Sequence, residues 1–286
     1  MEPVAAALAR LSKAQAKCAK ELEALSDTHS TSPAWASAGI AALVRLCHDP
    51  AAGGAYAATT LGNLSAADDA NDDRIREAGA ILPLVALLSG GFQSAAAGQA
   101  AFALSNLGHN IANCVAMTEA GAIPPLVALL PGGPMSEAAV EAACALSNLA
   151  MNNEVNRAAI IEAGAIAPLV ALLSGGPGFL EAARQAAKAL SNLTCTTEAN
   201  KAAVIEAGAV PPLVALLSCG ALSQAANSAA GALNNLAYGT NTTAVLEEVA
   251  RTQTDCSSWD DLREKLRERA SALLKAAEEG TDVAAL

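Results

Sequence analysis

The chain of 286 residues is 53% hydrophobic but only 2% aromatic, and it carries a formal net charge of −11. A core built mainly of Ala, Leu, Val and Ile favours helices. The acidity argues against broad nucleic-acid binding, which requires a basic face. The seven cysteines show no short paired spacing, so they indicate neither a disulfide framework nor a zinc site. No apolar run reaches the roughly 18 residues of a membrane-spanning helix, and we expect a cytoplasmic protein, with a nuclear location as the alternative.

The N-terminal segment, residues 1–30, is expected to form an amphipathic helix. Its apolar side chains run from Val4 to Leu25 at alternating spacings of four and three residues, interrupted by Gln15. Such a stripe can cover the exposed end of a core or seed a coiled coil. We interpret it as a capping helix and keep the coiled coil as the alternative.

Two phrases recur along most of the chain. The phrase EAG begins at Glu77, Glu119, Glu162 and Glu206, at intervals of 42, 43 and 44 residues. The phrase LSNL, or a near relative of it, centres on Asn63, Asn106, Asn148, Asn192 and Asn235, at intervals of 43, 42, 44 and 43 residues. A fixed period near 43 residues predicts a helical solenoid.

Each repeat contains signals for three helices. A short helix over residues 112–120 is expected to end at Gly121, which can adopt the left-handed conformation of a helix end. Pro124 and Pro125 then fit the first turn of a second helix, where a missing N–H costs little. That helix, PPLVALL, is apolar on nearly all sides and must be buried. The PGGP stretch at 131–134 ends it, and a third helix follows over residues 136–152.

The C-terminal segment, residues 241–286, is expected to form capping helices followed by a short tail. A capping box runs from Ser258 to Asp261. It precedes an apolar face that contains Trp259, Leu262, Leu266 and Leu273. We interpret this face as packing on the last repeat.

The phrase EAGAIPPLVALL followed by ALSNL resembles the armadillo repeat of β-catenin and importin-α. The resemblance implies an all-α, right-handed armadillo-type α-α superhelix of about five three-helix repeats, with capping helices at 1–30 and 241–286. Residues 31–70 form a degenerate first repeat, in which SAGIAALVRL and TLGNL replace the two phrases. The further repeats are expected at 71–110, 111–152, 153–196 and 197–240.

The sequence carries no signature of catalysis. His29, His48 and His109 lie far apart, and the phosphate-loop, dinucleotide, nucleophile-elbow and zinc-protease motifs do not occur. The glycine pairs recur with the repeat period, which indicates turns. We therefore expect no enzyme activity, no metal and no cofactor.

The resemblance also points to a binding site. In armadillo proteins the third helix lines the concave groove, which implies that Asn63, Asn106, Asn148, Asn192 and Asn235 face a bound partner. An Asn amide can pair with both the N–H and the C=O of an extended peptide. The alternative is that each Asn caps its own helix end or bonds a neighbouring turn.

The positions beside these asparagines differ from those of importin-α, which has tryptophans four residues before each Asn. Here the same positions hold Thr59, Phe102, Cys144, Lys188 and Gly231. Among the positions that flank the asparagines, Glu141 is acidic, whereas Arg184 and Lys188 make the fourth repeat basic. The predicted ligand exposes its backbone, places an acidic group near Arg184 and Lys188, and places an apolar group near Phe102 or Tyr238.

The sequence thus predicts a non-catalytic scaffold or adaptor that holds an extended peptide or a partner protein in the groove. The first alternative is a structural subunit of a larger assembly, bound through its terminal helices or its convex face. The second is a substrate-recognition partner of a ubiquitin ligase, because plant U-box ligases carry similar repeats. Direct binding to nucleic acid and a membrane span are not expected.

Overall fold

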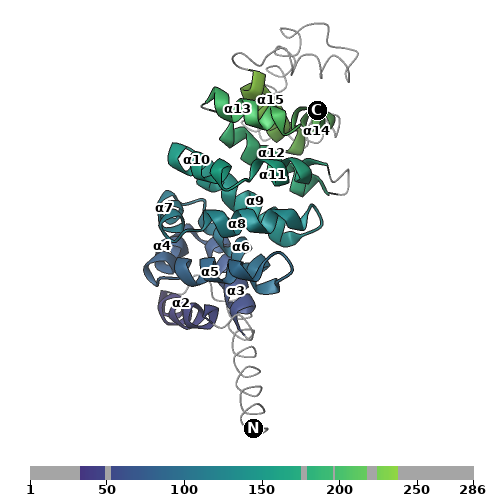
Figure 1. Cartoon of the computed structure of the whole chain (residues 1–286). Coiled ribbons are helices and arrows are strands. Elements are labelled where there is room, and N and C mark those ends of the chain that lie inside the picture. Colours follow the sequence, from purple (N-terminus) through teal and green to yellow (C-terminus); the bar gives the residue numbers. More distant parts are fainter. Residues whose placement is uncertain (1–32, 49–52, 175–178, 196, 218–223, 238–286) are drawn as a thin grey trace, which may run out of the picture. The chain divides into compact units, whose positions relative to one another are not determined.

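The computed structural model describes residues 33–48, 53–174, 179–195, 197–217 and 224–237 (Figure 1). All regular secondary structure within these ranges is helical, which confirms the all-α class predicted from the sequence. The two expected capping regions, residues 1–30 and 241–286, lie outside the described residues, and so does Tyr238.

The chain divides into two compact units, each of which is described by itself. Unit 1 comprises residues 1–132 and 136–149, and unit 2 comprises residues 133–135 and 150–286. The helices of unit 1 are α2 (Pro33–Cys47), α3 (Gly54–Ala67), α4 (Asp69–Glu77), α5 (Ile81–Leu87), α6 (Ala95–Leu107), α7 (Ile111–Glu119), α8 (Ile123–Leu129) and α9 (Glu137–Ala150), with 3₁₀ turns at Leu88–Gly90 and Leu130–Gly132. The helices of unit 2 are α10 (Glu154–Glu162), α11 (Ile166–Leu173), α12 (Leu180–Leu193), α13 (Glu198–Glu206), α14 (Val210–Leu217) and α15 (Gln224–Ala237).

The corner between the first and second helices of a repeat depends on one glycine. Helix α7 ends at Glu119, and Gly121 adopts a φ of 72°, in the left-handed region that favours glycine. The backbone N–H of Ala122 then donates to the carbonyl of Met117 at 3.0 Å, which closes the end of the helix. Helix α8 starts directly afterwards with its prolines in the first turn, as the sequence predicts. The same corner recurs at Gly79, Gly164 and Gly208, with φ values of 78°, 83° and 78°.

Each unit is built around small and branched aliphatic side chains. Leu126 and Leu129 of the second helix α8 are fully buried, as expected for a helix that is apolar on nearly all sides. The third helices α3 and α6 pack against each other in unit 1, and α12 and α15 do so in unit 2. Alanine and glycine at these contacts let the helix backbones approach closely, because there is little side chain between them.

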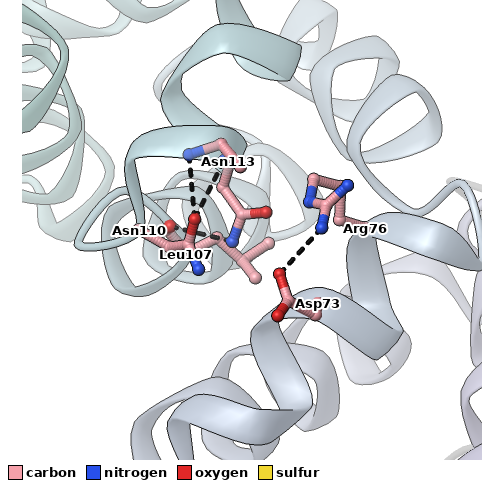
Figure 2. Close-up of polar contacts among 6 residues, drawn as sticks. Asp73, Arg76, Leu107, Asn110 and Asn113 are labelled. Atoms are coloured by element: carbon pink, nitrogen blue, oxygen red, sulfur yellow. Dashed lines mark hydrogen bonds and ion pairs between the residues drawn. The ribbon is translucent and has the colours of Figure 1, made fainter.

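A second row of asparagines, which lies outside the two repeated phrases, links the start of a first helix to the end of the third helix before it. The Nδ2 groups of Asn71 and Asn113 donate to the carbonyls of Leu64 and Leu107, at 2.8 and 3.1 Å. In unit 2, Asn200 Nδ2 donates to the Leu193 carbonyl at 3.1 Å. Figure 2 shows Asn113 beside Leu107, to whose carbonyl it donates, and beside Asn110, whose side chain caps α7. Each bond satisfies a carbonyl that the end of the third helix leaves without an intrahelical partner.

The close packing of α3 on α6 leads to a test with two matched glycines. A Cβ on Gly62 would lie 2.6 Å from Cε1 of Phe102 and 3.1 Å from the Ala103 Cα, whereas a Cβ on Gly98 would lie 3.6 Å from the Ala138 Cβ. We expect Gly62→Ala to lower the free energy of unfolding by about 1–3 kcal/mol, because the added methyl group overpacks the contact. Gly98→Ala should raise it by about 0.5–1 kcal/mol through helix propensity. Urea unfolding of the two variants measures both, and equal effects would contradict the packing argument.

Candidate functional site

The structure places the five predicted asparagines on third helices: Asn63 on α3, Asn106 on α6, Asn148 on α9, Asn192 on α12 and Asn235 on α15. Three of them donate to the preceding third helix of the same unit. Asn106 Nδ2 donates to the Gly62 carbonyl at 3.2 Å, and Asn148 Nδ2 donates to the Ser105 carbonyl at 3.0 Å. In unit 2, Asn235 Nδ2 donates to the Ser191 carbonyl at 2.9 Å. Each acceptor is the residue directly before the asparagine of the preceding repeat.

These bonds add a role to the two that the sequence leaves open: at Asn106, Asn148 and Asn235 the side-chain amide joins neighbouring third helices within a unit. That the asparagines face a bound partner stays a prediction. An Asn side chain has two N–H donors and the acceptor Oδ1. Asn235 Nδ2 donates to the Ser191 hydroxyl at 3.3 Å as well as to the Ser191 carbonyl. Asn106 and Asn235 are half-buried and keep part of this capacity accessible, whereas Asn148 is only 3% exposed.

The neighbouring side chains of unit 1 form a mixed surface. Phe102 lies half-buried against Gly62, and the Thr59 hydroxyl donates to Oε1 of Gln99 at 2.7 Å. Glu141 accepts a hydrogen bond from the Ser105 hydroxyl at 2.6 Å, so its carboxylate is partly engaged. The third-helix face of unit 1 is defined here as the accessible parts of Thr59, Asn63, Phe102, Asn106, Glu141 and Cys144.

In unit 2 the predicted basic pair has an acidic neighbour. Arg184 donates through Nε and Nη2 to the two carboxylate oxygens of Glu181, at 2.8 and 2.5 Å. Gln185 also donates to Glu181, at 2.8 Å. The hydrogen bond from Arg184 is the largest cause that holds the pKa of Glu181 below its usual range. Lys188 and Asn192 are half-buried on the same helix. Arg184 therefore offers a guanidinium that is already paired, and the surface is less basic than the sequence predicts.

The four described cysteines do not form disulfides, and two of their thiols are poor nucleophiles. Burial raises the pKa of Cys47 to about 12 and also raises the pKa of Cys114. Both side chains therefore stay protonated at neutral pH. Among the described residues, no group of three or more His, Cys, Asp or Glu side chains is arranged to hold a metal ion.

The described helices were also considered as possible membrane spans. Taken singly, none of them combines the length and the apolar character needed to cross a membrane. Three pairs of consecutive helices, bent by 91°, 85° and 84°, pass that test of length and composition only when both members are counted.

The comparisons with known proteins agree with one another in pointing to armadillo repeats. The family described as "Armadillo/beta-catenin-like repeat" matches residues 110–151, 152–195 and 197–238. A designed armadillo repeat protein in complex with the peptide (KR)4 is 29% identical, with a TM-score of 0.64 over 83% of this chain and 98% of that chain. An engineered protein is 31% identical, with a TM-score of 0.67 over 83% of this chain and 58% of that chain.

A natural protein with the same fold is more distant in sequence. A structure from work on the interaction between cadherin and beta-catenin is 17% identical, with a TM-score of 0.67 over 78% of this chain and 42% of that chain. No curated protein matches the sequence.

The hydrogen bonds between third helices can be tested at the most buried asparagine. We expect Asn148→Ala to lower the free energy of unfolding of the full chain by about 1–3 kcal/mol, because it leaves the Ser105 carbonyl without its donor. Asn227→Ala is the matched control, since Asn227 is an exposed position of α15, and it should change stability by less than about 0.5 kcal/mol. Urea unfolding measures the difference, and equal values would show that the Asn148 bond does not stabilise the fold.

Proposed function

The chain is an armadillo-repeat protein, and from that premise we propose that it is a non-catalytic scaffold that holds an extended peptide or partner protein on its third-helix faces. The observation that carries this proposal is the row of asparagines at one position of successive third helices. Asn106 donates to the Gly62 carbonyl, and Asn235 donates to the carbonyl and the hydroxyl of Ser191. Both side chains are half-buried, so part of each amide is accessible. Paired donor and acceptor groups of this kind suit a peptide backbone.

The spacing of the repeats supports the same ligand. Packed helices lie about 8–10 Å apart, and an extended chain rises about 3.3 Å per residue. Each repeat of a unit therefore faces two to three residues of an extended peptide. Backbone pairing at the asparagines gives affinity, and the residues four positions before them give selectivity.

The designed relative bound to (KR)4 suggests a basic peptide as the first comparison. In this chain the flanking positions hold Phe102, Cys144 and Lys188, and the carboxylate of Glu141 already accepts a hydrogen bond. We therefore propose that a ligand on unit 1 exposes its backbone and places an apolar side chain near Phe102. A ligand on unit 2 exposes its backbone and places an acidic group near Lys188 and Arg184.

The proposal is tested by selecting ligands and measuring them on variants. The full chain is used to select binders from a display library of random 12-residue peptides, and fluorescence anisotropy then gives their dissociation constants. We expect Asn106→Ala and Phe102→Ala each to raise the dissociation constant of a selected peptide about tenfold. This is the effect expected from the loss of a buried hydrogen bond or an aromatic contact. Gln93→Ala, in an exposed turn, is the control. Selected peptides that bind wild type and variants with equal affinity would refute the proposed site. A preference of the protein for (KR)4 over the selected peptides would refute the proposed ligand.

The ion pair of Arg184 provides a separate prediction. Glu181→Gln removes the carboxylate that holds the guanidinium, and the charge of Arg184 then becomes available to a ligand. We expect a peptide with a central Glu to bind this variant about two- to fivefold more tightly at low salt, as an exposed ion pair allows. The gain in affinity should disappear when the Glu of the peptide is replaced by Gln, and the affinity for the (KR)4 peptide should not increase. A Glu peptide whose affinity does not change would exclude Arg184 from the site.

A further inference from the structure

The first helices of unit 1 carry a surface that the third-helix proposal does not use. Asp69, Asp73 and Glu77 are exposed along α4 at intervals of four residues, and Ile111, Val115 and Glu119 are exposed along α7 at the same intervals. Side chains four residues apart share one face of a helix. We call these six residues the first-helix face.

The three exposed residues of α4 and the three of α7 form two columns that occupy equivalent positions in successive repeats. Each residue on α7 follows its counterpart on α4 by 42 residues, the local repeat period, so Asp69 pairs in position with Ile111 and Asp73 with Val115. Helices α4 and α7 pack against each other. Figure 2 shows Asp73 and Arg76 of α4 on one side and Asn113 of α7, with the N-cap residue Asn110, on the other. An acidic column therefore lies beside a partly apolar one.

The apolar column is unusually accessible. Ile111 is 82% exposed and Val115 is 48% exposed, although both are aliphatic and belong to the same helix face. A single exposed aliphatic side chain needs no explanation. Two of them in line, bordered by carboxylates, have the apolar centre and charged edge of a binding surface.

The charges around this face select its partner. Helix α4 with its cap Asp68 holds four accessible acids and the buried Asp72 against two arginines, and α7 adds Glu119 without any Lys or Arg. Both arginines are engaged locally, Arg74 with Asn71 at 3.1 Å and Arg76 with Asp73 at 2.7 Å. A second copy of the same face would bring like charges together, and an anionic membrane surface would also be repelled.

We propose that the first-helix face docks a basic amphipathic helix of a partner protein. The apolar residues of that helix, spaced three or four apart, cover Ile111 and Val115, and its Lys or Arg side chains reach Asp69, Asp73 and the two glutamates. This is helix-on-helix recognition, in which the apolar contact supplies the affinity and the charges set orientation and salt dependence. It is independent of peptide binding on the third helices.

The test uses the full chain and an 18-residue peptide of Leu and Lys with leucines at helical spacing. A shuffled peptide of equal composition, which has no apolar face, is the comparison ligand. Binding is measured by fluorescence anisotropy at low and physiological salt. We expect the double variant Ile111→Ser/Val115→Ser to lose about tenfold or more in affinity, because two aliphatic contacts are removed while every charge is kept.

Asp69→Asn/Asp73→Asn should weaken binding several-fold at low salt and less at high salt. Val155→Ser is the matched control, because Val155 is an aliphatic residue of α10 that is 75% exposed. This variant should not change the affinity for the peptide. Phe102→Ala should also leave this binding unchanged.

Three results would overturn the proposal: equal binding of the shuffled peptide, an unchanged affinity in the Ile111/Val115 variant, or a loss with Phe102→Ala. Sedimentation of the wild type and the Ile111/Val115 variant provides the remaining check. A change in oligomeric state would assign the face to self-association instead.

Discussion

The close approach of successive third helices is the constraint on which each unit depends. Gly62 leaves room for Phe102 of the next repeat, and Gly98 lies in ordinary contact distance of Ala138. Only at this short separation can the amide of Asn106 or Asn148 reach a carbonyl of the neighbouring helix. Small side chains and long-range hydrogen bonds are therefore two parts of one arrangement, because larger residues would separate the donors from their acceptors.

The sequence predicts best those features that depend on local chemistry. The corner at Gly121 requires a left-handed residue and is followed by Pro124 and Pro125, which tolerate the first turn of a helix; all of these signals lie within a few residues. The positions of the LSNL asparagines on third helices follow from the period. Their hydrogen-bond partners do not, because each acceptor lies 43 or 44 residues away and the choice depends on helix separation.

Two features were readable in the sequence and were missed. Asn71, Asn113, Asn156 and Asn200 recur at intervals of 42, 43 and 44 residues, each near the start of a first helix. Glu181 precedes Arg184 by three residues, a spacing at which opposite charges meet on a helix. Glu181 lies eleven residues before Asn192, outside the positions that flank this asparagine, although its carboxylate pairs with Arg184.

The asparagine row also explains how one repeat can serve both folding and binding. An amide that gives one N–H to the neighbouring helix is held in a fixed orientation, so its remaining groups are preorganised for a ligand. The structural bond and the proposed binding contact therefore reinforce each other at Asn106 and Asn235. In the proposed site, selectivity then falls to the residues four positions before each asparagine. These differ from repeat to repeat, as Thr59, Phe102, Cys144, Lys188 and Gly231 show.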